Sequence, residues 1–147
     1  MQFPTEKDAW LQMMSGIQEG TAIDANSIDL VDVHEAGIEL LMVIEDKHRQ
    51  PMGLMHGGIS MLLAETAASF HACWGVDLSQ VNPVGLEING SHLRSVREGT
   101  VRVVAKVVRR SRSFVVHQVD LFHVETDNHL TTVRVTHYYK TIKPVKA

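Results

Sequence analysis

The sequence predicts an α+β domain in which one long helix packs against a mainly antiparallel sheet. Two patterns predict this class: an apolar run of helix length at residues 56–74, and a series of β-like segments that continues after Pro83. With 147 residues, 44% hydrophobic and 21% charged, the chain fits one domain with a sizeable core. We see no repeat or linker, and we therefore expect a single domain over residues 1–147.

A short helix is expected first, at about residues 5–17. Thr5 is a suitable N-cap residue, and Asp8 adds a negative charge in the first turn. Apolar residues then recur with the spacing of one helical stripe: Trp10, Met13, Met14 and Ile17. Gly16 and Gly20 end this helix.

The next segments predict a hairpin and then the long helix. Residues 28–33 and 38–44 are rich in β-branched and other apolar side chains, and a turn at residues 35–37 separates them. Residues 56–74 follow as a helix of roughly five turns. This helix is apolar nearly all round and rich in small residues, so we expect it to be buried with other backbone close against it.

Four further strands are expected at about residues 84–93, 99–109, 113–125 and 129–140. In the second of them apolar residues alternate with others, which indicates one buried face. Because these strands follow one another with short turns, we expect them to form an antiparallel meander.

Composition and charge exclude several classes of protein. A net charge of −3 and a pI near 6.3 argue against a nucleic-acid binder, which must neutralise many phosphates. The single cysteine, Cys73, excludes an intramolecular disulfide and a cysteine-based zinc cluster. The nine histidines are spread without a ligand-type cluster, so we expect no metal.

The apolar segments bear on the location of the protein. The first residues lack the basic and apolar regions of a secretory signal. The run from Leu54 to Val76 is interrupted by Gly57, Gly58, two histidines and Glu65, which is unlike a membrane span. We therefore expect a cytoplasmic protein with no membrane or nucleic-acid partner.

Glu65 is the only charged side chain in that run. An ionised carboxylate buried without a partner costs several kcal/mol, so its presence needs a reason. Either it is a core carboxylate with a polar partner, or one that faces a subunit interface, or it is a catalytic base or nucleophile. Ser69 lies four residues later on the same helical face and is a candidate partner for Glu65.

The sequence His56-Gly57-Gly58 stands directly before the helix. Backbone N–H groups at a helix N-terminus are unpaired and carry the positive end of the dipole, and glycines let a ligand atom come close. This arrangement suits a developing oxyanion, although a plain turn into a helix has the same residues. Six arginines near strand ends form either a solvated face or a site for a phosphorylated ligand: Arg94, Arg97, Arg102, Arg109, Arg110 and Arg112.

Two stretches of the chain resemble one enzyme family. Residues 50–58 read QPMGLMHGG and are followed by LAE at 63–65, while residues 84–95 read VGLEINGSHLRS and are followed by REG at 97–99. Together they resemble the hotdog-fold acyl-CoA thioesterases. The branch is that of the Arthrobacter-type 4-hydroxybenzoyl-CoA thioesterases and the bacterial 1,4-dihydroxy-2-naphthoyl-CoA and enterobactin-pathway thioesterases. The resemblance covers about residues 27–140.

This resemblance implies the hotdog fold, a long central helix wrapped by a curved, mainly antiparallel sheet. Members of the family pair their sheets edge to edge, and their active sites lie at the dimer interface. A sheet on one helix leaves an edge strand to cover, so a homo-oligomer, either a dimer or a dimer of dimers, is physically reasonable.

The resemblance also implies a reaction, the hydrolysis of an acyl-CoA thioester to free acid and coenzyme A without a cofactor. In the family pattern Glu65 is the catalytic base or nucleophile, and the Gly57 N–H polarises the thioester carbonyl. Further roles fall on His56, Gln50 and Ser69 in catalysis, and on His92, Gly58, Arg94 and Arg112 in substrate binding, the two arginines at the coenzyme A phosphates.

Two other functions stay open from the sequence. One is a hotdog 3-hydroxyacyl-thioester dehydratase, and the other is a non-catalytic acyl-CoA-binding module. The spacing from His56 to Glu65, together with Gln50, favours hydrolysis over dehydration. The acyl group is either aromatic or of medium chain length, and the candidates for an apolar acyl pocket are Met52, Phe70 and Trp74.

Overall fold

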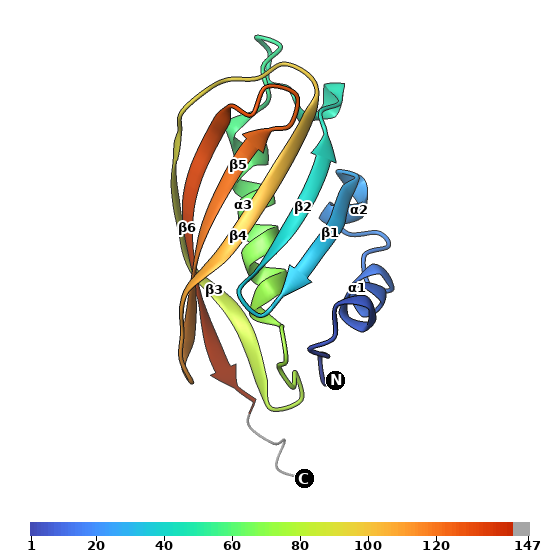
Figure 1. Cartoon of the computed structure of the whole chain (residues 1–147), viewed down its shortest axis with the longest axis vertical. Coiled ribbons are helices and arrows are strands. Elements are labelled where there is room, and N and C mark those ends of the chain that lie inside the picture. The colour runs from blue at the N-terminus through green and yellow to red at the C-terminus, as the bar shows by residue number, and fades with distance from the viewer. Residues whose placement is uncertain (143–147) are drawn as a thin grey trace.

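The structure of the chain is a computed structural model that describes residues 1–142. One long helix, α3, packs against a six-stranded antiparallel sheet, which confirms the predicted α+β class (Figure 1). In chain order the elements are α1 (Lys7–Ser15), α2 (Ala22–Ala25), β1 (Ile28–His34), β2 (Gly37–Val43), η1 (Asp46–His48), α3 (Gly57–Ala72), β3 (Val81–His92), β4 (Thr100–Arg110), β5 (Phe114–His123) and β6 (His129–Thr141). The predicted hairpin is β1–β2, and the short helix α2 was not expected.

The strand order in the sheet is β1-β2-β4-β5-β6-β3, and each neighbouring pair is antiparallel. The expected meander is therefore wrong in one respect. β3 pairs with β6 at the far edge of the sheet, and β2 takes the place beside β4. The reason is that α3 lies between β2 and β3 in the chain and crosses the sheet, so the chain re-enters at the opposite edge.

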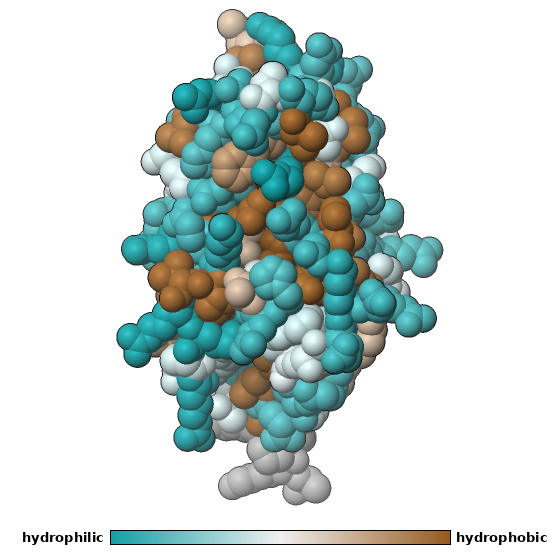
Figure 2. All heavy atoms as spheres, in the orientation of Figure 1, coloured by the Kyte–Doolittle hydropathy of each residue, from teal (hydrophilic) through white to brown (hydrophobic). Residues whose placement is uncertain are grey.

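Small side chains on one side of α3 allow the sheet to approach it closely. Ala64, Ala67 and Ala68 have no exposed surface, and they belong to one core cluster with buried side chains of the sheet. Alternate residues of β4 and β5 are buried, so these strands have one face on α3 and one facing outward. Figure 2 shows the surface from the side of Figure 1, with hydrophilic residues interspersed among hydrophobic ones.

The N-terminal helix belongs to the core. Trp10 of α1 has no exposed surface, and its ring centroid lies 6.4 Å from those of Phe3 and Trp74 and 6.5 Å from that of Phe70. Phe70 and Trp74 therefore pack on α1, while Met52 lies exposed in the loop before α3, so the three candidates for an acyl pocket do not lie together in the single chain.

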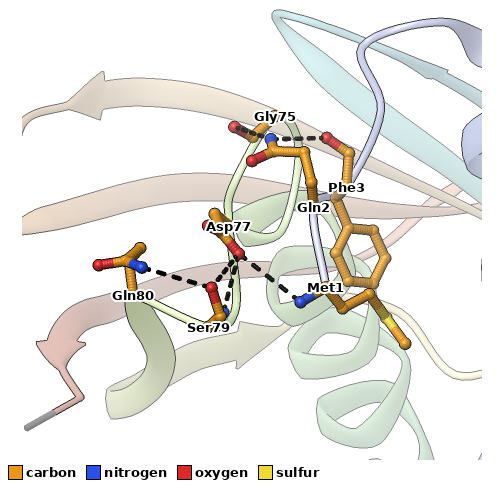
Figure 3. Close-up of polar contacts among 7 residues, drawn as sticks. All are labelled: Met1, Gln2, Phe3, Gly75, Asp77, Ser79 and Gln80. Atoms are coloured by element: carbon orange, nitrogen blue, oxygen red, sulfur yellow. Dashed lines mark hydrogen bonds and ion pairs between the residues drawn. The ribbon is translucent and has the colours of Figure 1, made fainter. Parts of the chain in front are cut away.

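The first residues are tied to the connection between α3 and β3 (Figure 3). Gln2 Nε2 donates a hydrogen bond to the Gly75 carbonyl at 3.1 Å, and the terminal ammonium lies 3.6 Å from Asp77 Oδ1. Hydrogen bonds from the Ser79 backbone and hydroxyl lower the pKa of the Asp77 carboxyl.

The helix α1 begins one residue later than expected. Its N-cap is Glu6 instead of Thr5, and no side chain caps it.

Replacing Trp10 by Ala is expected to lower the free energy of unfolding by about 3–5 kcal/mol, the usual effect of removing a large buried aromatic side chain. Trp10→Phe should lose less, because the buried Nε1–H has no hydrogen-bond partner among the described residues. Urea unfolding measures both changes. Ile17→Ala, at a half-exposed site after α1, is the control and should change the value by less than about 0.5 kcal/mol. Equal effects at the two positions would contradict a core role for α1.

Candidate active site

The N-terminus of α3 presents one unpaired backbone N–H. His56 is the N-cap, and its Nδ1 accepts a hydrogen bond from the Gly58 N–H at 2.8 Å. Gly57 is the first residue of the helix, so its N–H has no intrahelical partner. Two glycine N–H groups were expected to meet a ligand. The N–H of Gly58 is bonded to the cap residue His56, so only the N–H of Gly57 is available to a ligand at the positive end of the helix dipole.

The imidazole of His92 lies directly against Gly57. A Cβ atom on Gly57 would lie 2.8 Å from His92 Nε2, so only glycine leaves room for this ring. His92 is the last residue of β3, and its Nδ1 lies 3.3 Å from the hydroxyl of buried Thr131. The ring is therefore held next to the N–H that a ligand would meet.

A pocket of about 310 Å³ opens beside Gly57 and His92. Gln50 lines it from a tight loop in which the Gln50 N–H bonds the Leu54 carbonyl and the Gly53 N–H bonds the Gln50 carbonyl. The Gln50 Oε1 accepts the Met52 N–H, so the N–H groups of the side-chain amide stay available as donors. Arg94 also lines the pocket. The structure therefore brings together four of the predicted site residues: Gln50, Gly57, His92 and Arg94.

Glu65 lies outside this pocket. It is two turns further along α3, its side chain is exposed, and its Oε1 lies 3.2 Å from the position of a Cβ on Gly85. The expectation of a buried carboxylate is wrong for the single chain. α3 buries the side that carries the small residues, while Glu65 lies on another side of the helix, next to β3.

Ser69 is hydrogen-bonded to a histidine that the sequence analysis did not single out. Its Oγ lies 2.7 Å from Nε2 of His137 on β6, and no hydrogen bond joins it to Glu65 among the described residues. His137 is 1% exposed and is paired with Gly85 across β3 and β6. Glu65, Ser69, Gly85 and His137 form a second group, which we call the carboxylate cluster. The only sequence signal for His137 was its place among the core-facing residues of β6.

The two arginines expected at coenzyme A phosphates lie at different ends of α3. Arg94 lines the Gly57 pocket, and Arg112 lines a separate pocket of about 360 Å³ near the C-terminal end of the helix, together with Arg110. The 16 residues of α3 span roughly 24 Å at 1.5 Å per residue, so one pocket of a single chain does not hold both arginines.

Residues 52–128, more than half of the chain, match the thioesterase superfamily. The chain belongs to this superfamily. It is 34% identical over 112 residues to the 1,4-dihydroxy-2-naphthoyl-CoA hydrolase of Escherichia coli, which covers 76% of this chain and 82% of that protein. A mutant thioesterase of Pseudomonas aeruginosa superposes with a TM-score of 0.84 at 29% identity, over 90% of this chain and 94% of the other. A Haemophilus influenzae thioesterase gives 0.84 at 28% identity, over 92% and 94%.

As a member of the thioesterase superfamily, the chain has the hotdog fold and is a thioester hydrolase, which confirms the resemblance carried by residues 50–65 and 84–99. None of the helices in residues 1–142 has both the length and the apolar character needed to cross a membrane. In the same part of the chain, no three His, Cys, Asp or Glu side chains gather in a way that would hold a metal ion.

This thioesterase also buries a row of histidines behind the carboxylate cluster. His71 Nδ1 and His117 Nε2 lie 2.8 Å apart, and His71 Nε2 donates to the His34 carbonyl. Burial, with a smaller contribution from the nearby Arg110 guanidinium, lowers the pKa of His71 to about 4 and that of His117 to about 3. Burial also lowers the pKa of His137. These three rings are therefore neutral at neutral pH.

The free energy of unfolding is expected to fall as the pH decreases from about 6.5 to 5. The folded-state pKa values of His71, His117 and His137 lie below 6.5, so the unfolded chain takes up protons that the folded chain excludes. The contribution of these neutral rings to the free energy of unfolding is fully present above pH 6.5. It is lost as the pH falls toward the folded-state pKa of each ring, by up to about 1.4 kcal/mol per pH unit for each ring. Carboxyl groups with a lowered pKa, such as Asp77, act only at lower pH.

Urea unfolding across this pH range measures the slope. The variant His117→Phe removes one ring that must stay neutral and should show a shallower slope than the wild type. A free energy of unfolding that does not change between pH 6.5 and 5 would contradict the burial of neutral histidines.

Proposed function

We propose that this thioesterase hydrolyses acyl-CoA thioesters to a free acid and coenzyme A, with Glu65 as base or nucleophile. The observation that carries the proposal is the Gly57 N–H, unpaired at the start of α3 and open to a pocket lined by Gln50 and His92. A thioester oxygen bound there gains negative charge as the carbonyl carbon is attacked. A fixed N–H donor at that position lowers the barrier by on the order of 3 kcal/mol.

The proposed site is shared between two copies of the chain. Glu65 is outside the Gly57 pocket, and β3 is a 12-residue edge strand whose outer side has no neighbour in the described residues. Such an edge favours pairing with another strand. An antiparallel pair of β3 strands centred between Ile88 and Asn89 places Gly85 opposite the partner subunit's His92. Glu65 then faces the partner's Gly57 pocket.

The same pairing brings Arg112 of one copy near the partner's Arg94. The pocket that contains Arg112 also contains Gln80 and Val81 at the start of β3. In an antiparallel pair with this centre, the start of β3 lies near the end of the partner's β3, which the partner's Arg94 follows by two residues. Guanidinium groups pair well with phosphate, so the proposed coenzyme A phosphate site also forms between the two copies.

Two chemical roles of Glu65 fit this site. As a nucleophile, its carboxylate attacks the carbonyl carbon and expels coenzyme A as the thiolate, and water then hydrolyses the mixed anhydride. As a base, it takes a proton from the attacking water. The Gln50 amide orients the thioester or the water, and Ser69 assists the carboxylate.

The acyl group proposed is aromatic. The lining of the Gly57 pocket includes apolar side chains beside its polar donors, namely Leu54, Met55, Leu93 and Val96. The named Escherichia coli relative acts on a naphthoyl thioester. A panel of aromatic and aliphatic acyl-CoAs ranks the acyl groups directly.

Glu65→Gln is expected to lower kcat by about 10²–10⁴-fold, the usual contribution of a positioned general base, with the fold intact. Thiol release from the acyl-CoA panel, followed with a chromogenic thiol reagent, measures this change. Glu19→Gln makes the same chemical substitution at an exposed site after α1 and should leave kcat unchanged.

Three outcomes would contradict the proposal. Near wild-type activity in Glu65→Gln would remove Glu65 from the mechanism. Enoyl absorbance from a 3-hydroxyacyl-CoA without thiol release would indicate a dehydratase. Binding of coenzyme A by a folded protein that releases no thiol from any substrate would indicate a binding module.

A further inference from the structure

A buried histidine lies behind Ser69, and the mechanism above does not use it. His137 Nε2 lies 2.7 Å from Ser69 Oγ, and the ring is 1% exposed. Glu65 Oε1 and His137 Nε2 both lie within 4 Å of one point beside Gly85, because the missing side chain of Gly85 leaves space there. His137 is therefore close to the proposed catalytic carboxylate, and Ser69 is the residue of this cluster that it bonds.

The groups that face His137 come from three elements. Ser69 of α3 bonds its Nε2, and the ring of His117 on β5 lies edge-on with the centroids 6.5 Å apart. Gly85 of β3 is its cross-strand neighbour and admits Glu65. Burial lowers the pKa of both histidines, so the His137 ring is neutral and carries one proton.

The surroundings decide which nitrogen carries that proton. His137 Nδ1 is shielded from solvent and has no hydrogen-bond partner among the described residues. A proton on Nδ1 would leave a buried N–H unpaired, whereas a proton on Nε2 leaves only an acceptor unpaired. Orphaned buried N–H groups are the rarer and costlier case. The proton is therefore on Nε2, which donates to Ser69 Oγ.

This bond restricts the direction of the Ser69 hydroxyl. Because Oγ accepts from His137, the hydroxyl proton has to point away from the ring. A helical side chain leans toward the preceding turn, and for Ser69 that turn carries Glu65. Glu65 does not bond this hydroxyl in the single chain, so the proton is free for the carboxylate when the exposed Glu65 side chain turns toward Ser69.

We propose that His137 is a positioning residue that donates to Ser69 Oγ and so keeps the Ser69 hydroxyl available as a hydrogen-bond donor to the Glu65 carboxylate when substrate is bound. The proposal rests on the proposed function, because Glu65 must be the reacting carboxylate for the positioning to affect turnover. It makes Ser69 a donor that holds the carboxylate in its reactive orientation while the substrate is bound.

The kinetic test uses single and double variants with acyl-CoA substrates. His137→Leu and Ser69→Ala should each lower kcat by about 3- to 10-fold, the effect of one hydrogen bond, with KM little changed. In the Ser69→Ala background, His137→Leu should have no further effect on kcat. His137→Gln, whose amide N–H reaches Ser69, should restore most of kcat. His129→Leu is the matched control, since His129 on β6 bonds Asp120 instead.

Two kinetic results would overturn the proposal. One is an unchanged kcat in His137→Leu, and the other is a loss that multiplies with that of Ser69→Ala, as expected of a residue that only supports the fold. If His137→Leu does not fold, His137→Asn serves in its place, because its shorter amide does not reach Ser69.

A second readout does not depend on turnover. Long-range proton–nitrogen NMR of the imidazole rings of the wild type at neutral pH should show His137 protonated at Nε2 and unprotonated at Nδ1. The opposite tautomer would overturn the proposal even in an active enzyme. A protein with the expected tautomer that hydrolyses no thioester would instead contradict the proposed function.

Discussion

The packing of α3 into the curve of the sheet is the constraint on which the rest of the structure depends. Three alanines with no exposed surface, Ala64, Ala67 and Ala68, bring the helix close to the core side chains of the sheet. This packing fixes which side of the helix is buried and where its N-terminus lies. Because that end is fixed beside the last residue of β3, the Gly57 N–H opens next to His92 and a pocket.

The same packing divides the predicted site. A helix held along the sheet carries Gly57 at one end and Glu65 two turns away, so donors and carboxylate lie in different places within one chain. A glycine allows close packing in both places, because a side chain on Gly57 would contact His92 and one on Gly85 would contact Glu65. The exposed carboxylate and the open edge of β3 lie on the same side of the molecule. The proposed pairing of two β3 strands would account for both features.

Local signals in the sequence predicted the fold class, the helix start and most strand segments, because helix caps, turns and alternation depend on neighbouring residues. The place of β3 beside β6 depends on a pairing between distant strands and was not predicted. The exposure of Glu65 was missed because a helix that is apolar nearly all round does not indicate which of its sides the sheet covers. His137 was missed because it meets Ser69 across 68 residues of sequence.

A site completed by two chains is the central claim, and mixed dimers test it most directly. Glu65→Ala and Gln50→Ala chains, each strongly impaired alone, can be co-expressed with different affinity tags so that only mixed dimers are isolated. If the two residues act across the β3 pair, each mixed dimer has one intact site and should show about half of the wild-type thioesterase activity. If mixed dimers form but are no more active than the two variants alone, the site lies within one chain and the account is wrong.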